Sequence, residues 1–517
     1  MTCSFRIMPG ESWFGGSTNV GINEPFTSDS VFSFDYRGNC PNQTMPFFLS
    51  DKGRYIWSEN TFRISFDHGV ITAEGDSEIT MTEAGTTLRD AYLAAMKAHF
   101  PFENKKLPEV FFRTAQYNTW MQYTYDPTEA GVLRYAHDIV DNGFEPGIFI
   151  IDEGWHGRYG IWKFDLLKFP HPKEMIAELH EMGFKVMLWV VPYVSPDGKD
   201  FDLSLWPEVN PNYKEQYLRN GNGDVALVSW WNGISAALDM TKECDREFLD
   251  GKLHTLMDEY GVDGFKFDGG AVDAYAPHWL MNKPAGTEHT PEELNIAWNE
   301  FGSRYEYHEY KDTYRGGGKA VIERLQDRDH SWDDGGILSL IPSAIVQGLI
   351  GSPYVCPDMI GGGRWIYREL YADRFDAELF VRMAQCSALF PMMQFSWAPW
   401  EALDEYHLSL VRNAAMLHKS VADEICALVD HARLTGEPIL RSLEYEDPGK
   451  GYTAITDEFM LGSDILVAPV LAKGAVSRRV TFPEGTWVSQ ADGREYAGGT
   501  VCEVSAPIDV LPWFRRK

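Results

Sequence analysis

A short apolar segment that ends in a carboxylate is the first place where this sequence could do chemistry. Residues 261–270 read GVDGFKFDGG, and the apolar positions are typical of a short buried strand. Because side chains alternate along a strand, Lys266 and Asp268 point to the same face. In barrels of parallel strands, a carboxylate at a strand end is a common position for a nucleophile or base. An Asp that only caps the next segment is the alternative.

A second acidic cluster follows at residues 327–336, which read DRDHSWDDGG. It lies outside any amphipathic pattern, in a loop before an apolar helix expected over 337–350. Two carboxylates on separate loops suit glycoside hydrolysis, in which one attacks the anomeric carbon or activates water and the other protonates the leaving oxygen. Trp332 would provide apolar surroundings that keep such an acid protonated. The alternative is a charged surface loop in which Asp333 or Asp334 caps the helix.

Other polar residues stand where predicted strands end. Asp152 follows the apolar run 148–151, Trp189 ends the run that starts at 185, and Asp358 follows 353–355. Any one of them could be a cap or a loop hydrogen bond. A (β/α)₈ barrel, however, collects residues from its strand ends at one mouth. Together with the strand that ends at Asp268, these positions predict one site built from several strands.

The strand and helix patterns around these residues predict an α/β fold in three parts. Residues 1–105 show short alternating strands, which indicate an N-terminal β-sandwich. Residues 106–430 alternate apolar strands with amphipathic helices such as 173–182, a pattern that predicts a parallel sheet covered on both faces. This length suits a (β/α)₈ TIM barrel. A doubly wound sheet is the alternative, but no GxGxxG opens a helix. Strands return over 431–517 and predict a C-terminal β domain.

Composition narrows the choice of partners. The 46 basic and 76 acidic residues give a net charge of −30, which disfavours nucleic acid as a partner. Aromatic residues make up 14% of the chain, as expected for a carbohydrate-binding cleft or for large cores. No apolar run approaches the roughly 20 residues of a membrane span. The sequence leaves the oligomeric state open, with a homo-oligomer among the alternatives.

The cysteines and the first residues bear on localisation. The seven cysteines show no spacing typical of a zinc site, and reduced thiols account for them simply. The first residues lack the basic and apolar regions of a signal peptide. We therefore expect a cytoplasmic protein that needs no metal.

Long motifs in order resemble glycoside hydrolase family 31, a family of retaining enzymes that act on α-linked sugars. The resemblance covers roughly residues 105–515, and within the family the motifs resemble the branch of myogenesis-regulating glycosidases, which is associated with α-galactoside hydrolysis. The matching runs are DEGW at 152–155, LWVVP at 188–192, DGFKFD at 263–268, RLQDRD at 324–329, SLIP at 339–342, PDMIGG at 357–362, MQFS at 393–396 and GSDILVAPV at 462–470.

The resemblance implies a role for each matched residue. The family's Lys-x-Asp motif makes Asp268 the nucleophile, and the acid/base is an Asp in a loop after a Trp. The run 339–342 as anchor selects Asp334, whereas Trp332 as anchor leaves Asp333 as the alternative. The implied substrate-binding residues are Asp152, Trp189, Trp231, Lys266, Arg324, Arg328, Trp332, Asp358 and Gln394. Of these, Arg324 or Arg328 would pair with the carboxylates and keep Asp268 ionised. Trp231 could equally be a core residue.

The sequence therefore predicts a retaining exo-acting α-glycosidase, with an α-galactosidase favoured, that works by double displacement through Asp268 and Asp334. This chemistry needs no metal or organic cofactor. An α-glucosidase or another α-hexosidase is the alternative, and a non-catalytic sugar-binding protein on the same scaffold is a further one. The aglycone, and the choice between hydrolysis and transglycosylation, stay open.

Overall fold

Eight parallel strands close into a barrel at the centre of the molecule, and the computed structural model describes residues 1–276, 286 and 288–517. In sheet order, which is also chain order, the strands are β9 (Gln116–Asn118), β10 (Ile148–Ile151), β11 (Lys185–Val190), β15 (Gly264–Phe267), β16 (Tyr307–Tyr310), β18 (Glu323–Arg324), β19 (Val355–Cys356) and β20 (Gln394–Phe395). β20 pairs with β9. A hydrogen bond of 2.8 Å from the N–H of Ile360, just after β19, to the carbonyl of Gln394 in β20 joins the remaining two neighbouring strands and closes the barrel. The predicted (β/α)₈ barrel is confirmed, and the doubly wound alternative is wrong.

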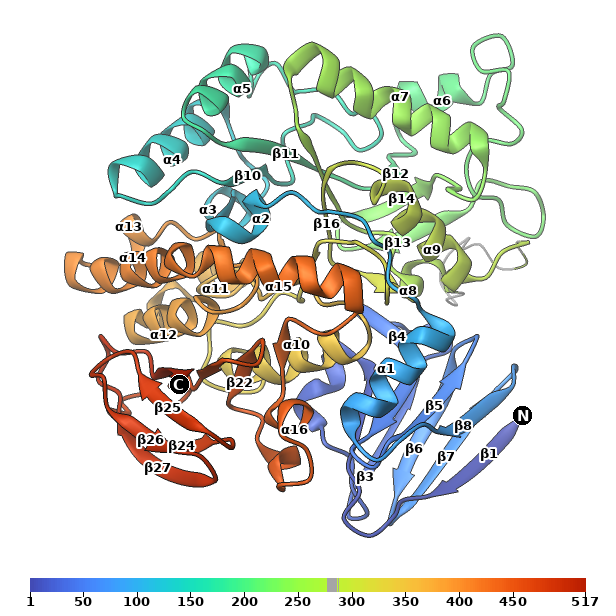
Figure 1. The fold of residues 1–517 in the computed structure, drawn as a ribbon. Coiled ribbons are helices and arrows are strands. Elements are labelled where there is room, and N and C mark those ends of the chain that lie inside the picture. Colours follow the sequence, from blue (N-terminus) through green and yellow to red (C-terminus); the bar gives the residue numbers. More distant parts are fainter. Residues whose placement is uncertain (277–285, 287) are drawn as a thin grey trace.

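Helices cover the outside of this ring (Figure 1). They include α4 (Glu129–Asp141), α5 (Pro172–Glu181), α7 (Glu243–Tyr260), α9 (Pro291–Gly302), α10 (Leu340–Leu349) and α12 (Ala377–Ser387). α5 buries Met175, Ile176 and Leu179 on one face, as its 3.6-residue periodicity requires. α10 is buried on all sides because it packs against the barrel and both flanking β domains.

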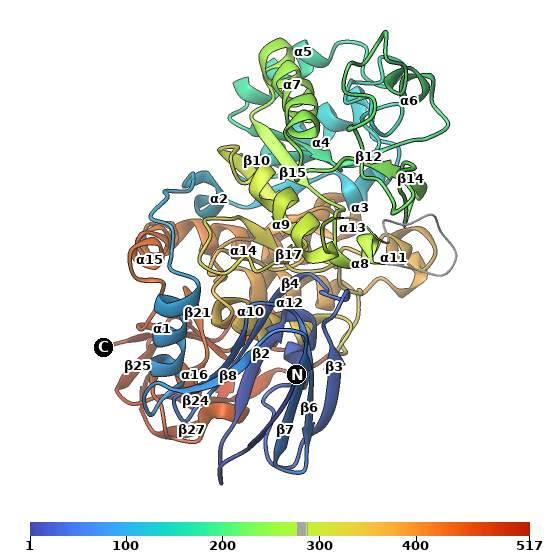
Figure 2. The same cartoon turned by 90° about the vertical axis from the view of Figure 1, so that its right-hand side faces the viewer.

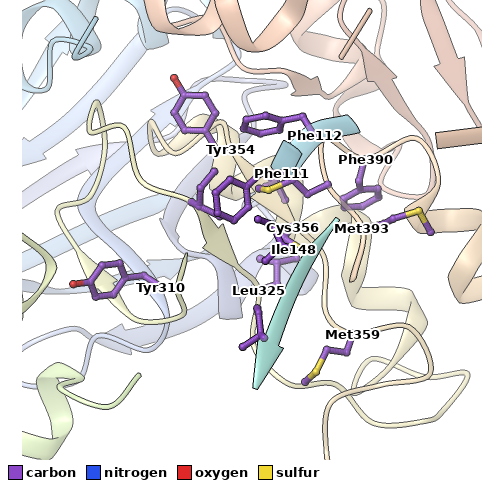
Figure 3. Packing of buried hydrophobic residues seen from close by; sticks show 14 of the residues in the cluster. Phe111, Phe112, Ile148, Tyr310, Leu325, Tyr354, Cys356, Met359, Phe390 and Met393 are labelled. Carbon is purple, nitrogen blue, oxygen red and sulfur yellow. The ribbon is translucent and has the colours of Figure 1, made fainter. Parts of the chain in front are cut away.

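Apolar side chains from distant parts of the chain meet in the core of the barrel. Ile148 of β10, Leu325 after β18 and Cys356 of β19 are all fully buried. Figure 3 shows Phe111 and Phe112 packed beside the same cluster. The complete burial of β10 explains its unbroken apolar sequence, since neither of its faces meets water.

The N-terminal domain consists of two sheets packed face to face. One contains β1 (Thr2–Arg6), β7 (Val70–Gly75), β6 (Phe62–Asp67) and β3 (Val31–Asp35), and the other contains β2 (Trp13–Ser17), β4 (Gln43–Ser50), β5 (Arg54–Ser58) and β8 (Ile79–Glu83). Phe48 and Ile56 of the second sheet share a core with Phe62 and Ile64 of the first. The predicted β-sandwich is confirmed, and helix α1 (Leu88–His99) leads from it to the barrel (Figure 2).

The second sheet of this sandwich extends into the barrel domain. β17 (Thr313–Tyr314), which lies three residues after barrel strand β16, pairs in parallel with β4. The residues between β16 and β17 are therefore held by both domains. Sequence patterns gave no sign of this pairing, because a two-residue strand has no measurable periodicity.

Two further β regions complete the chain. After β11, the strands β12 (Tyr193–Val194), β14 (Gly233–Ala237) and β13 (Leu227–Trp230) form a small sheet beside the barrel. The C-terminal domain holds a six-stranded sheet that starts at β21 (Leu440–Arg441), as expected, although the boundary expected at 430 falls inside helix α15 (Ala422–Thr435). Within the described residues, no helix is both long and apolar enough to cross a membrane.

Candidate active site

A cavity of about 390 Å³ lies at the carboxyl ends of the barrel strands. Its ionisable groups are Asp152, Glu153, Lys266, Asp268, Lys311, Arg324, Asp327 and Arg364, and its aromatic rings are Trp120, Tyr125, Trp189, Trp231 and Trp365. The strands β10, β15, β16 and β18 each supply a residue at or just beyond their last position, and β11 supplies Trp189 one position before its end. A larger cavity of about 560 Å³ lies beside α6 (Lys199–Ser204) and α7, away from these strand ends.

Asp268 is buried at the end of β15 with both of its oxygens engaged. Oδ2 accepts a hydrogen bond of 2.9 Å from Nε1 of Trp189, and Oδ1 accepts one of 2.9 Å from the N–H of Gly269. Gly269 and Gly270 have φ values of +62° and +67°, and a Cβ on Gly270 would lie 2.5 Å from the ring of Trp298. The two glycines therefore allow the chain to turn away directly after the carboxylate.

The charge state of Asp268 follows from its neighbours. Burial alone raises its pKa, but the ammonium groups of Lys311 and Lys266 and the hydrogen bonds from Trp189 and Gly269 outweigh burial. The pKa of Asp268 consequently lies below its ordinary value. This carboxyl group is an anion at neutral pH, which is the state that a nucleophile or base requires.

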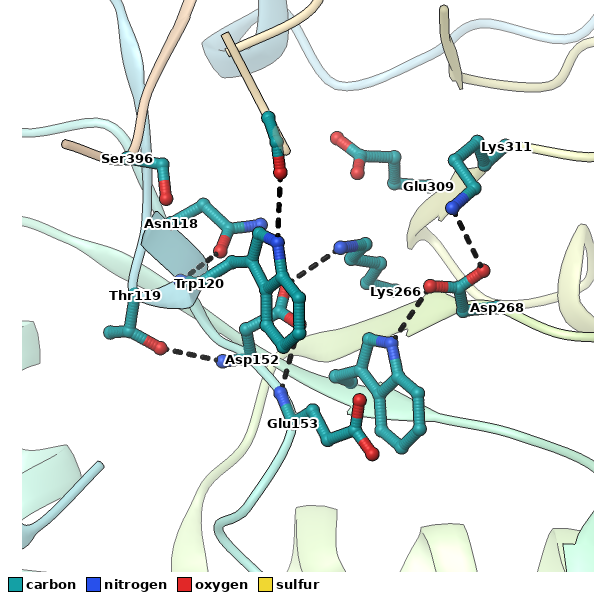
Figure 4. A network of polar contacts seen from close by, with 12 residues as sticks. Asn118, Thr119, Trp120, Asp152, Glu153, Lys266, Asp268, Glu309, Lys311 and Ser396 are labelled. Carbon is teal, nitrogen blue, oxygen red and sulfur yellow. Dashed lines mark hydrogen bonds and ion pairs between the residues drawn. The ribbon is translucent and has the colours of Figure 1, made fainter. Parts of the chain in front are cut away.

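Lys266 and Asp152 form an ion pair at the closed end of the cavity (Figure 4). Nζ of Lys266 lies 2.6 Å from Oδ2 of Asp152, and both side chains are nearly inaccessible to solvent. Thr119 holds the backbone of Asp152 in place, because its hydroxyl oxygen accepts a hydrogen bond of 2.8 Å from the N–H of Asp152. The pair gives the closed end one donor and one acceptor beside the buried ring of Trp189.

Lys311 bridges two carboxylates from different loops, those that follow β15 and β18. Its Nζ lies 3.7 Å from Oδ1 of Asp268 and 3.6 Å from Oδ2 of Asp327. These two oxygens are therefore separated by no more than the sum of the two distances, 7.3 Å. This upper limit admits the spacing of about 5–5.5 Å between the carboxyl groups of retaining glycosidases, and it excludes only the upper part of the range of about 6.5–9.5 Å found in inverting ones.

Asp327 stands three residues beyond β18, and its side chain is 30% exposed to the cavity. Oδ1 lies 2.9 Å from Nη1 of Arg324. Burial raises the pKa of Asp327, but Lys311 and Arg324 outweigh it and the pKa lies below the ordinary value. Lys311 is held as an ammonium ion by the same carboxylates, since Asp268 and Asp327 raise its pKa against the effect of burial.

The structure corrects the expected position of Asp334. Asp334 is exposed and does not line the cavity, and neither does Asp333, which accepts hydrogen bonds from the hydroxyl of Ser331 and the N–H of Gly335. Trp332 also lies outside the cavity, with its Nε1 donating to Asp376 at 3.0 Å. The acidic cluster does reach the site, but through its first carboxylate, Asp327.

Three other expected binding residues lie behind the cavity wall. Asp358 is buried and accepts from Nη1 of Arg324 at 2.7 Å and from the N–H of Arg328 at 2.6 Å. Arg328 donates to the hydroxyl of Ser343, and burial lowers its pKa to about 10. Gln394 donates to Glu309 at 2.7 Å inside the barrel. These residues support the site, and none of the three lines it.

Glu153 is a site residue that motif reasoning did not single out, although it follows Asp152 directly. It accepts from the hydroxyl of Tyr159, from the amide of Asn232, and from Nε1 of Trp231 at 3.4 Å. Burial raises its pKa to about 8, so that the carboxyl group is largely protonated at neutral pH. It ties the turn between β13 and β14 to the end of β10.

Comparisons with known proteins agree with this architecture. Residues 111–407 match the Glycosyl hydrolases family 31 TIM-barrel domain, and residues 436–517 match the Glycosyl hydrolase family 31 C-terminal domain. The "Myogenesis-regulating glycosidase" of Mus musculus is 33% identical over 77% of this chain and 55% of its own length. "Alpha-glucosidase 2" of Bacillus thermoamyloliquefaciens is 24% identical over 91% of this chain and 61% of its own length.

Solved structures show the same fold. A GH31 alpha-xylosidase from a soil metagenome, complexed with xylose, has a TM-score of 0.80 at 20% identity and covers 100% of this chain and 79% of its own. The GH31 dextranase of Flavobacterium johnsoniae has a TM-score of 0.81 at 19% identity over 100% of this chain and 66% of its own. The chain spans little more than half the length of the two curated relatives. On its two matched domains, the chain belongs to glycosyl hydrolase family 31.

Proposed function

We propose that this protein is a retaining, exo-acting α-glycosidase in which Asp268 is the nucleophile and Asp327 the acid/base. The observation that supports this proposal is the pair itself: both carboxylates line one cavity, their nearest named oxygens lie within 7.3 Å, and one ammonium group contacts both. Catalysis of this kind requires two carboxyl groups on either side of the scissile bond.

Asp268 is suited to attack the anomeric carbon. Its lowered pKa keeps it ionised, and the hydrogen bond from Trp189 fixes the orientation of the carboxylate. Attack by one oxygen forms a glycosyl ester on Asp268 and breaks the bond to the leaving oxygen. That oxygen takes a proton from Asp327 in the same step.

Asp327 must donate a proton in the first step of the reaction and accept one in the second. Lys311 and Arg324 lower its pKa, which suits the second step, where its carboxylate removes a proton from water. For the first step it must be protonated. A bound sugar would cover its 30% exposed side chain, and loss of contact with solvent raises the pKa of a carboxyl group.

The bound sugar would occupy the closed end of the cavity. Asp152 and Lys266 offer a paired acceptor and donor for its hydroxyl groups, and the buried indole of Trp189 forms a wall. An α-galactoside is the substrate that we favour, because the motifs resemble the branch of the family associated with α-galactoside hydrolysis. The discrimination between axial and equatorial O4 would fall to hydrogen bonds at this end.

A panel of aryl α-glycosides tests the proposal. The wild type should turn over the α-galactoside faster than the α-glucoside, α-xyloside and α-sulfoquinovoside, and NMR should detect the α-anomer as the first product. Asp268→Asn should abolish turnover with little change in melting temperature. A β-anomer as first product would contradict the retaining mechanism, and failure to turn over every glycoside would favour a non-catalytic sugar-binding protein.

A further inference from the structure

One nitrogen of the Arg324 guanidinium group is shared by two aspartates. Nη1 lies 2.9 Å from Oδ1 of Asp327, which lines the active-site cavity, and 2.7 Å from Oδ1 of Asp358, which lies behind the cavity wall. The two Oδ1 atoms are therefore separated by no more than the sum of these distances, 5.6 Å. A Cβ on Gly363 would lie 2.6 Å from Oδ1 of Asp358 and 2.9 Å from Oδ1 of Asp327, so a larger residue there would force at least one of them away.

Asp358 is held in its ionised form. Its Oδ2 accepts hydrogen bonds of 2.6 Å from the N–H of Arg328 and from the N–H of Gly363, and its Oδ1 accepts from Arg324. All three partners are donors, which stabilise a carboxylate more than a protonated carboxyl group. Burial raises the pKa of Asp358 to about 6 against the opposing effect of Arg324, and the charge of Asp327 adds to this rise. Asp358 is consequently an anion at neutral pH.

Arg324 needs such a partner whenever Asp327 carries a proton. The Arg324 side chain is 1% exposed, so bulk water cannot replace a lost carboxylate, and an uncompensated buried charge is costly. Glu309 is a poor substitute, since its Oε1 lies 3.7 Å from Nε of Arg324 and neither atom has a hydrogen-bond partner among the described residues. Asp358 is therefore the carboxylate that neutralises Arg324 in the form of the protein in which Asp327 is protonated.

We propose that Asp358 is a positioning residue that controls the protonation of the acid/base Asp327 through the shared Arg324. The inference rests on the proposed function. Because Asp358 stays ionised, Arg324 remains paired when Asp327 gains a proton, and the free-energy cost of that protonation falls. The coupling is reciprocal: the charge of Asp327 raises the pKa of Asp358, so the charge of Asp358 raises the pKa of Asp327 by the same amount.

The neighbouring charges explain why Asp327 needs this help. Besides Arg324 and Glu309, the charged or titratable groups that face the two aspartates are Lys266, Lys311, Arg328 and the thiol of Cys356. Burial raises the pKa of the thiol well above its ordinary value, so the thiol stays neutral. The cations all favour the ionised form of Asp327, which suits a base but not an acid. Asp358 supplies an opposing negative charge without entering the cavity.

The test compares two substrates that share one sugar but differ in their demand for an acid. An alkyl α-glycoside needs a proton on its leaving oxygen, whereas the α-glycosyl fluoride needs little assistance. Asp358→Asn should move the basic limb of the pH–kcat profile for the alkyl glycoside down by about 1–2 pH units, because Asp327 then loses its proton more readily. The kcat for the fluoride should stay within about threefold of the wild-type value.

A matched control and a second measurement separate this role from a merely structural one. Asp245→Asn is the control, because Asp245 is also buried, accepts from the N–H of Tyr217 at 3.0 Å and of Asp239 at 2.7 Å, and lies outside the cavity. Infrared absorption of protonated carboxyl groups requires neither turnover nor a variant at Asp358. In Asp327→Asn, the titration of Asp358 should move to lower pH by about 1–2 units, since the coupling is reciprocal.

Each outcome decides between the two proposals. A folded Asp358→Asn variant that keeps the basic limb of the wild type, or that loses activity on both substrates equally at every pH, would overturn the role of Asp358 and leave the proposed function intact. An equal shift of the limb in Asp245→Asn, or an infrared titration that Asp327→Asn does not move, would do the same. A wild type that hydrolyses neither substrate would refute the proposed function, and the role of Asp358 would fall with it.

Discussion

Replacement of Lys311 by Met should move the acidic limb of the pH–rate profile to higher pH. Lys311 lies 3.7 Å from Asp268, whose other cationic neighbour, Lys266, is paired with Asp152. Removing the ammonium group leaves Asp268 with burial, which raises its pKa, and with one cation fewer to oppose it. A nucleophile with a raised pKa stays protonated, and inactive, up to a higher pH.

The size of the shift follows from the distance. Two unit charges about 4 Å apart interact by about 4 kcal/mol at an effective dielectric constant of about 20. Water that enters the space vacated by the Lys311 ammonium group would offset part of this energy. An opposite charge at this range commonly lowers a carboxyl pKa by about 1–3 units. We therefore expect the acidic limb to rise by about 1–3 pH units, and kcat/KM measured below that limb to fall by about tenfold per unit.

The assay is the pH dependence of kcat/KM with an α-glycosyl fluoride, whose leaving group makes little demand on the acid. Lys319→Met is the matched control, because Lys319 forms an ion pair of 2.8 Å with Glu300 at the surface, away from the cavity. Differential scanning fluorimetry would establish that both variants are folded. A folded Lys311→Met variant with the acidic limb of the wild type would refute the electrostatic role of Lys311.

Three further predictions follow from the same contacts. Asp334→Asn should leave kcat/KM within about twofold of the wild-type value, since this side chain is exposed. Asp327→Asn should lower kcat/KM by about 10²–10⁴-fold for a substrate with a poor leaving group, and added azide should restore part of that rate. The opposite ranking of the two variants would return Asp334 to the site. Glu153 has a pKa of about 8, so the wild type should show an ionisation near pH 8 in activity or Trp fluorescence, and Glu153→Gln should remove it. Gln43→Met should lower the free energy of unfolding by about 1–3 kcal/mol, because the Gln43 amide donates to the part-buried carbonyl of Lys311 at 2.8 Å and to the buried carbonyl of Arg324 at 2.9 Å. Urea titration would measure this loss, and a change within about 0.5 kcal/mol would contradict it.

The barrel could be predicted because its strands are buried on both faces. Runs such as Ile148–Ile151 have no polar face, and the same burial explains why residues at their ends project into a common site. Strand β16 was not predicted, since it reads YHEY and carries Glu309 into the polar interior. Without that strand, Lys311 could not be recognised as a strand-end residue like Asp268.

The loop after β18 brings to the cavity a carboxylate other than the predicted one, Asp327 instead of Asp334, and the reason is physical. Trp332 was expected to shelter the acid, but its ring is half buried against other elements and donates to Asp376 instead. The more reliable guide was distance from a strand end: Asp327 lies three residues beyond Arg324, whereas Asp334 lies ten beyond it. A long loop can carry a charged residue back to the surface, and this loop does so after Asp327.

The N-terminal sandwich holds the backbone of two residues that line the active site. Gln43 is almost completely buried, and its single amide nitrogen holds the backbone of Lys311 and of Arg324, two of the cations that line the cavity. The parallel pairing of β17 with β4 fixes the same segment a second time. Both cations contact Asp327, and Lys311 also contacts Asp268. The separation and charge state of the two carboxylates therefore depend on a domain that supplies no side chain to the cavity, and a barrel expressed without it would lose the alignment of its cations even if its strands still closed.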